Sequence, residues 1–396
     1  MKFVEETPLR KAPCWSRRLG QGALAGGSLL LAGQAQAQVK VQPQPGTLYL
    51  SDFFKSNQPD QMSHGEIVER SALSSGFSGP IVRHEVPDNP LTEKAHRLGS
   101  YLDQRQFTPE EMRTYLGSYA EQCQVGQMQS ATADLRMWLE QGAHHSSINL
   151  SRGCGQAQVV EAIYHQVNDA WGFEGASQVA SLRRLNKVAA GLEVDVPSLL
   201  SRDPQVAGPA RQEFQQKLVD LVARASQHSP LLAQAQSEYD EVVNQLAQSK
   251  VSITVAAANS GTLLDEMARE AYGLRLHTPA NFWNNRLANA QVVTVGGTSQ
   301  GRVAPYTNPD PGIDFWADGD ARVDPKDPSK LVNYGTSFAA PRLGVLLSRA
   351  HQLHPDWSNQ QAEQFLREHL TAPLDNQTPA IDPAAAHDYL IAPGRS

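Results

Sequence analysis

Short runs rich in β-branched residues mark the strands that the hydrophobic pattern predicts. Such runs occupy residues 47–50, 251–261 and 292–295. The run at 251–261 is typical of a buried strand, and it ends in small residues and an asparagine. Asp52 follows the first of these runs, and Asn259 lies near the end of the second. An acidic residue just past a buried strand lies where α/β sheets place their chemistry.

Apolar residues at helical spacing predict several helices. A Ser-Pro pair at 229–230 separates two such segments, and the sequence Thr-Pro-Glu-Glu at 108–111 predicts a further helix that begins with proline. Another apolar helical run occupies residues 342–350. The apolar face of the segment before Pro230 consists of Phe214, Leu218, Leu221, Val222 and Ala225, and that of the segment after it of Leu232, Ala235, Tyr239, Val242, Val243 and Leu246.

Length and charge limit the classes of protein that the chain can represent. Its 396 residues are 40% hydrophobic, which is enough for one large or two small domains with a substantial core. The formal net charge is −7. The first 37 residues have a net charge of +3, so the rest of the chain has a net charge of −10. An acidic balance argues against nucleic-acid binding by bulk electrostatics.

Residues 1–37 have the organisation of an export signal. A basic stretch ends at Arg17-Arg18, an apolar Gly-rich segment covers residues 19–33, and Ala35-Gln36-Ala37 matches an A-x-A cleavage site. The apolar segment is too short and too rich in glycine for a membrane span. We therefore expect a secreted or periplasmic protein, and the adjacent arginines leave both the ordinary secretory route and twin-arginine export open.

A candidate nucleophile lies at the start of the 342–350 helical region. Residues 333–341 read N-Y-G-T-S-F-A-A-P, which places Ser337 among small residues at a helix start. A serine there can present its hydroxyl while the free N–H groups of the helix face the group that it attacks. Acyl transfer needs this combination of nucleophile and oxyanion site. The alternative is that the Gly-Thr-Ser sequence only caps a helix.

The serine segment resembles the G-T-S-x-A-x-P pattern of the subtilisin-like serine proteases, or subtilases. The fixed positions are matched by Gly335, Thr336, Ser337, Ala339 and Pro341. The resemblance implies a three-layer α/β/α fold with a mostly parallel central sheet, formed by residues 38–396. It leaves residues from about 156 to 230 as a helical insertion, which we interpret either as structural elaboration or as a lid or docking surface.

The same resemblance assigns further site residues. His64-Gly65 matches the start of the family's histidine segment, and His64 is the only one of the twelve histidines that precedes a glycine. Asp52 is then the acid of the triad, because a predicted strand precedes it, although the family's D-[ST]-G has become Asp-Phe-Phe. Asp60, four residues before His64, is its rival. Asn259 matches the family's oxyanion asparagine, and Ala258 replaces the glycine that usually precedes it.

Residues 147–153, S-I-N-L-S-R-G, resemble the family strand whose edge pairs with bound peptide. The resemblance makes Ser151, Arg152 and Gly153 candidate substrate-binding residues, and a core strand without a ligand is the alternative. Of three cysteines, Cys14 lies in the export signal, so Cys123 and Cys154 could form one disulfide outside the cytoplasm. The other interpretation is that these two are buried thiols.

The function expected from these residues is that of an exported serine endopeptidase acting on peptides or proteins. Two alternatives remain open, namely a catalytically impaired binding module and a transpeptidase whose acyl-enzyme is resolved by an amine. No cofactor is expected. Calcium sites are common in the family, but no acidic loop of this chain has a ligand pattern that supports one. The oligomeric state is not predicted.

Overall fold

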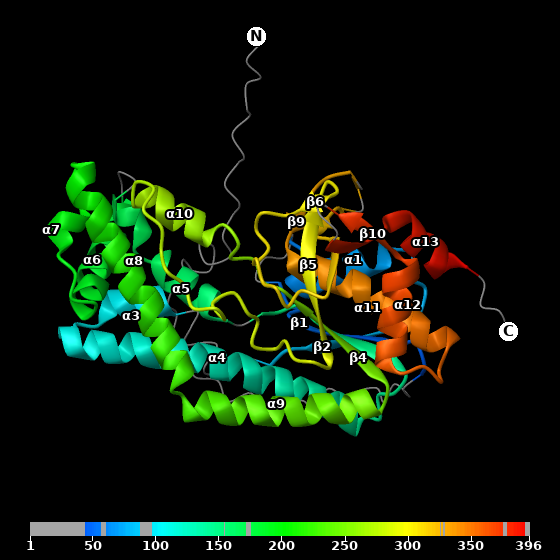
Figure 1. Cartoon of the computed structure of the whole chain (residues 1–396). Helices are drawn as coiled ribbons and strands as arrows, with labels where there is room; N and C mark the ends of the chain where they lie inside the picture. Colours follow the sequence, from blue (N-terminus) through cyan, green and yellow to red (C-terminus); the bar gives the residue numbers. More distant parts are fainter. Residues whose placement is uncertain are drawn as a thin grey trace, which may run out of the picture.

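The structure is a computed structural model that describes residues 44–56, 61–87, 97–153, 155–171, 176–324, 326–327, 329–374 and 378–392. The predicted export signal lies outside these residues. Within them, no helix combines the length and apolar character that crossing a membrane requires. Figure 1 shows a sheet-containing part and, beside it, a part built from helices.

A mostly parallel sheet forms the centre of the first part. The order of its strands is β10-β11-β7-β5-β4-β3-β1-β2, and β6 pairs with β5. Within this sheet, as far as the structure describes it, only the β10–β11 and β5–β6 pairs are antiparallel. The predicted strands at 47–50, 251–261 and 292–295 are confirmed by β1, β4 and β5, although β4 ends at Ala256, before the small residues and the asparagine. The strands are β1 (Leu48–Asp52), β2 (Ile81–Glu85), β3 (Ser146–Leu150), β4 (Val251–Ala256), β5 (Val292–Ser299), β6 (Arg302–Val303), β7 (Phe315–Asp318), β10 (Thr371–Leu374) and β11 (Thr378–Ile381), and β8 (Asp320–Ala321) pairs separately with β9 (Asn333–Tyr334).

Helices cover both faces of this sheet. On one face lie α1 (His64–Leu73), α11 (Thr336–Leu353), α12 (Asn359–His369) and α13 (Pro383–Ile391), and on the other lie α4 (Pro109–Glu140) and α9 (Pro230–Gln248). Successive side chains of β1 point to opposite faces of the sheet and pack against different helices. Leu48 and Leu50 pack on the α11 side, and Tyr49 packs on the α4 side. The predicted three-layer α/β/α fold is therefore confirmed.

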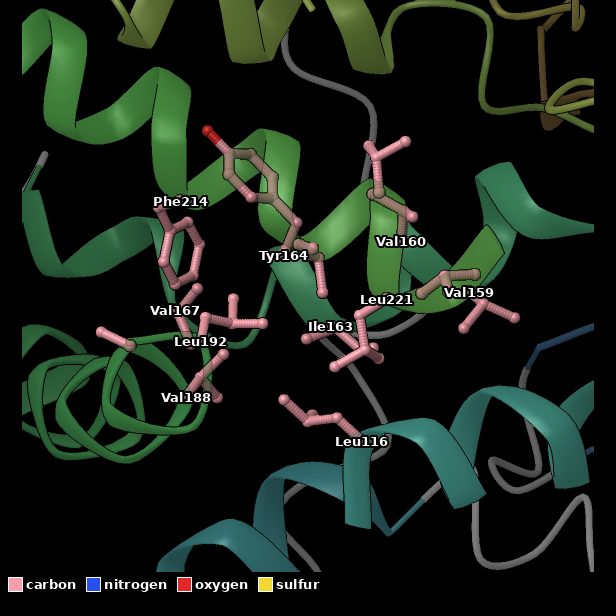
Figure 2. Packing of buried hydrophobic residues seen from close by; sticks show 14 of the residues in the cluster. Leu116, Val159, Val160, Ile163, Tyr164, Val167, Val188, Leu192, Phe214 and Leu221 are labelled. Carbon is pink, nitrogen blue, oxygen red and sulfur yellow. The ribbon is translucent and has the colours of Figure 1, made fainter. Parts of the chain in front are cut away.

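The helical part has a core of its own. It contains α3 (Leu98–Gln104), α5 (Gln156–Tyr164), the 3-10 turn η2 (Asn168–Trp171), α6 (Ala176–Gly191), α7 (Val196–Leu199), α8 (Pro204–Gln227) and α10 (Leu263–Glu270). Figure 2 shows how Phe214 and Leu221 of α8 face Ile163 and Tyr164 of α5. The predicted apolar faces before and after Pro230 are confirmed, since α8 and α9 bury them and only Ala225 is partly exposed.

This core extends beyond the residues predicted as an insertion. It includes Leu98 and Leu102 of α3 before residue 156, and Leu263, Met267 and Phe282 after residue 230. The chain contributes to it in three separate passes, so the helical part is not one continuous addition to the sheet.

One helix belongs to both parts. The 32 residues of α4 start at the predicted position, where Thr108 accepts a hydrogen bond from the N–H of Glu111 and Pro109 is the first helical residue. Its first half, through Met112 and Leu116, packs in the helical core. Its second half, through Met128 and Leu135, packs under the sheet. The helix therefore links the two cores directly.

Candidate active site

Three neighbouring parallel strands end at one edge of the sheet, and each leads to a predicted site residue. Asp52 is the last residue of β1, Ser151 follows the end of β3, and Asn259 lies just beyond the end of β4. The strands β1, β3 and β4 are adjacent and parallel, so their carboxyl ends share this edge. The fold thus brings together groups that lie far apart in the sequence.

Asp52 and His64 form the first contact of the site. Nδ1 of His64 lies 2.7 Å from Oδ1 of Asp52, and the N–H of Phe53 donates to the same oxygen at 2.7 Å. His64 is the first residue of α1, which Ser63 caps through a hydrogen bond with the N–H of Glu66. This cap fixes where α1 begins, and hence where His64 lies. The rival acid, Asp60, lies outside the described residues.

The surroundings of His64 change its proton affinity in opposite directions. Burial disfavours the charged imidazolium and lowers the pKa of His64. The negative charge of Asp52 and its hydrogen bond raise this pKa, and together they outweigh the burial, so that the pKa lies above the usual value of 6.5. An imidazole held in this way can accept a proton and keep the resulting positive charge next to a carboxylate.

Ser337 lies on the first turn of α11. The helix begins at Thr336, so the N–H of Ser337 is among those that the helix itself leaves unbonded. In this structure the Ser337 hydroxyl donates to the carbonyl oxygen of Ser151 at 3.2 Å, and the Ser151 hydroxyl donates to the carbonyl of Ser337 at 2.7 Å. The ring of Phe338, the next residue, has its centroid 5.5 Å from that of His64. The serine segment and the histidine are therefore neighbours.

Asn259 is oriented by the residue that precedes Ser337. Its Oδ1 accepts hydrogen bonds from the N–H of Thr336 at 2.9 Å and from the Thr336 hydroxyl at 3.0 Å. The amide nitrogen is then the donor end of an exposed side chain. A side-chain carbon at Gly335 would lie 3.0 Å from that nitrogen, so the close approach favours glycine there. The arrangement suits a donor for an oxyanion near Ser337.

Ala258, in the place of the family's glycine, has an unusual backbone conformation. Its φ angle is +78°, in the left-handed region that side chains with a Cβ disfavour. Its N–H donates to the Thr336 hydroxyl at 3.1 Å, and its carbonyl accepts from the N–H of Asn308 at 3.2 Å. These hydrogen bonds hold a strained residue directly before Asn259.

The side chain of Arg152 is directed away from the site. Its guanidinium pairs with Asp134 and donates to the Ser130 hydroxyl, both on α4, and the side chain is 10% exposed. Gly153 lies beside Ala258 and Asn285. Substrate binding by Ser151, Arg152 and Gly153 stays a prediction. For Arg152 it could involve only the main chain, because the side chain is directed toward α4.

Two further predictions concern cysteine and metal. The Tyr119 side chain hydrogen-bonds the thiol of Cys123, and burial raises the pKa of that thiol to about 12. Cys154 lies outside the described residues, so the Cys123–Cys154 disulfide stays a prediction. Across the part of the chain that the structure covers, there is no group of three or more His, Cys, Asp or Glu residues placed to hold a metal ion.

Comparison with known proteins found similar solved structures. No curated protein matches the chain. Similar solved structures include a lanthipeptide protease (15% identity, TM-score 0.42, 86% of each chain covered) and MycP1 from Mycobacterium smegmatis (15%, TM-score 0.39, 89% of this chain and 82% of that one). Another is the epidermin leader peptide processing serine protease of Staphylococcus aureus (12%, TM-score 0.37, 89% and 78%).

The model of the subtilase family matches residues 219–382. This range includes Asn259 and Ser337 and excludes Asp52 and His64, which lie before it. Over these residues the chain is similar to the subtilase family.

Proposed function

We propose that the protein is an exported serine endopeptidase that hydrolyses peptide bonds through Asp52, His64 and Ser337. The observation that carries the proposal is the Asp52–His64 contact of 2.7 Å at the sheet edge, next to the helix start that holds Ser337. Export rests on the sequence of residues 1–37. The proposed substrates are peptides or proteins outside the cytoplasm.

In the proposed reaction the Ser337 oxygen attacks the carbonyl carbon of the scissile amide while His64 takes the hydroxyl proton. To reach His64, the hydroxyl hydrogen turns from its present acceptor, the Ser151 carbonyl. Asp52 holds the imidazole orientation and stabilises the imidazolium. The Asn259 amide and the Ser337 N–H then donate to the oxyanion. His64 returns the proton to the leaving amine, and water, activated by the same histidine, releases the acyl group.

Covalent labelling tests this assignment directly. We expect a fluorophosphonate to modify the purified, folded protein at Ser337, identified by peptide mass spectrometry. Ser337→Ala should abolish the labelling, whereas Ser348→Ala on the same helix should not, because Ser348 is fully buried. Absence of labelling in correctly folded protein with the export signal removed would refute the proposal.

The other two functions considered are separated by product analysis. A binding module would retain its biological activity after Ser337→Ala, whereas a peptidase would lose it. If mass spectrometry of a cleaved peptide with an added amine shows the amine-linked product in excess over the free acid, the enzyme is a transpeptidase. We expect the free acid to dominate.

A further inference from the structure

A tight turn at Ser151 sets the place of the proposed nucleophile. The N–H of Arg152 donates to the carbonyl of Leu150 at 2.7 Å, which folds the main chain sharply just after β3. Ser151, at the centre of this turn, forms two hydrogen bonds with Ser337, one through its carbonyl and one through its hydroxyl. A displacement of Ser151 would therefore move the Ser337 hydroxyl.

The turn is fastened to α4 by the side chain that follows it. Arg152 pairs with Asp134, which is 1% exposed, and its Nη1 donates to the Ser130 hydroxyl at 2.9 Å. Ser130 and Asp134 are one helical turn apart on α4, so they face the same side of that helix. Two anchors on one rigid helix fix both the position and the direction of the guanidinium.

Asp134 also contacts the strand next to the one that ends at Asp52. Nε2 of His84 on β2 lies 3.2 Å from Oδ1 of Asp134, and the ring of His84 packs edge-on against Trp138 with centroids 5.7 Å apart. Trp138 in turn donates to the hydroxyl of Ser51, the residue before Asp52, at 3.2 Å. Side chains of α4 thus contact side chains next to Ser151 on one side of the site and next to Asp52 on the other.

Stability alone does not account for a buried ion pair at this position. Removing two charges from water costs free energy that their attraction repays poorly, and well-packed apolar residues of similar size are often at least as stabilising. The ion pair does, however, fix the orientation of the Arg152 side chain, which an apolar contact would not. Arg152 is the residue after Ser151, so this orientation affects the position of Ser151 and of the Ser337 hydroxyl that it contacts.

We infer that Arg152 and Asp134 are positioning residues for Ser337. Their ion pair holds the turn at Ser151 in place, and the carbonyl and hydroxyl of Ser151 in turn fix the position of Ser337. Neither Arg152 nor Asp134 touches the substrate with its side chain. This inference rests on the proposed peptidase function.

The test compares Asp134→Asn with the unaltered protein. The change keeps the shape of the side chain and removes its charge. We expect the rate of fluorophosphonate labelling at Ser337 and the value of kcat/KM to fall by about 10- to 100-fold, because small displacements of a reacting group have effects of this size. The loss should lie mainly in kcat. A matched control is Asp103→Asn, which breaks the pair with Arg184 in the helical part and should change neither quantity.

A double variant separates positioning from folding. A single change at Asp134 leaves the Arg152 charge buried without its partner and should lower the unfolding midpoint. Asp134→Leu combined with Arg152→Met removes both buried charges, so the unfolding midpoint of the double variant should lie near that of the unaltered protein. If the pair positions Ser337, labelling remains slow although stability is restored. Recovery of labelling together with stability, or normal labelling in Asp134→Asn, would overturn the inference. Failure of the unaltered protein to label would instead refute the peptidase function itself.

Discussion

The sheet-containing part and the helical part bury similar kinds of residues but treat their polar groups differently. At the sheet edge, Asn259 is exposed and Ser337 is partly exposed. In the helical part, the polar groups around Glu270 bond to one another: its carboxylate accepts from the Tyr164 hydroxyl and from Nε1 of Trp171 at 2.8 Å, and Gln215 donates to the Tyr164 hydroxyl at 3.0 Å.

This difference follows from the geometry of the two architectures. Parallel strands end together, so the polar residues after them meet at one edge and face outward. Packed helices bring polar side chains together within the core, where each must find a partner. We therefore expect substitutions at the sheet edge to change the chemistry, and substitutions in the helical part to change the free energy of unfolding.

The largest expected effect is that of Asp52→Asn. By analogy with other Ser-His-Asp sites, kcat should fall by about 10⁴-fold, which corresponds to about 5.5 kcal/mol of barrier. The matched change in the helical part, Glu270→Gln, removes a charge that burial disfavours and should leave turnover per folded molecule unaltered. Peptidase assays on folded protein measure both variants, and equal losses of turnover would erase the contrast.

The same variant should also alter the pH dependence. Asp52 raises the pKa of His64 above 6.5, and His64 must be neutral to act as the base, so activity is lost as the pH falls through that raised value. Asp52→Asn leaves the effect of burial, which lowers this pKa. The acid limb of the residual activity should therefore shift to lower pH. A limb that stays in place would argue against His64 as the base.

Phe214→Ala tests the helical part from its own side. Phe214 is fully buried and packs edge-on against Trp171, with ring centroids 6.0 Å apart. Removing the ring should reduce the free energy of unfolding by about 3–5 kcal/mol. Urea denaturation followed by fluorescence measures this loss, and Val206→Ala, at an exposed position of the same helix, should have little effect. Turnover per folded molecule should be unchanged.

His351 should make the sheet part sensitive to acid. This fully buried histidine on α11 contacts the Ser252 hydroxyl at 2.9 Å, and burial lowers its pKa to about 4. Between pH 6.5 and 4 the unfolded chain binds a proton that the folded protein does not bind, so the free energy of unfolding falls by up to about 3 kcal/mol as the pH is lowered. Denaturation across this range should show that His351→Gln removes this decrease, whereas His387→Gln, at an exposed position, should not.

The smallest expected effect is that of Ala258→Gly. Glycine adopts a φ of +78° without the penalty of a Cβ, so this variant should be more stable by about 1 kcal/mol. Ala257→Gly is the control. Ala257 is buried and, unlike Ala258, does not have a positive φ, so this variant should be less stable. Equal losses in the two variants would show that residue 258 is not strained.

The sequence predicts the sheet edge far better than it predicts the helical part. Local patterns around Ser337, Asn259 and His64 indicated their chemistry, and the strands before Asp52 and Asn259 indicated their place in the fold. These signals are local, because a strand end or a helix start is encoded within a few residues.

The contacts of Arg152 could not be predicted in this way. Its partners, Ser130 and Asp134, lie on a helix and look like ordinary polar helix residues, and nothing in the sequence pairs them with an arginine beyond the next strand. The extent of the helical core has a similar cause. Three separate passes of the chain form it, so no single segment carries the pattern.

The length of α4 has a consequence for attempts to shorten this chain. At a rise of about 1.5 Å per residue, its 32 residues extend roughly 48 Å from the helical core to the underside of the sheet (Figure 1). A deletion that removes the helices beside the sheet would leave the first half of α4 without neighbours, and a deletion that cuts α4 would endanger the anchor of Arg152. A shortened chain would need a redesigned surface for that exposed half.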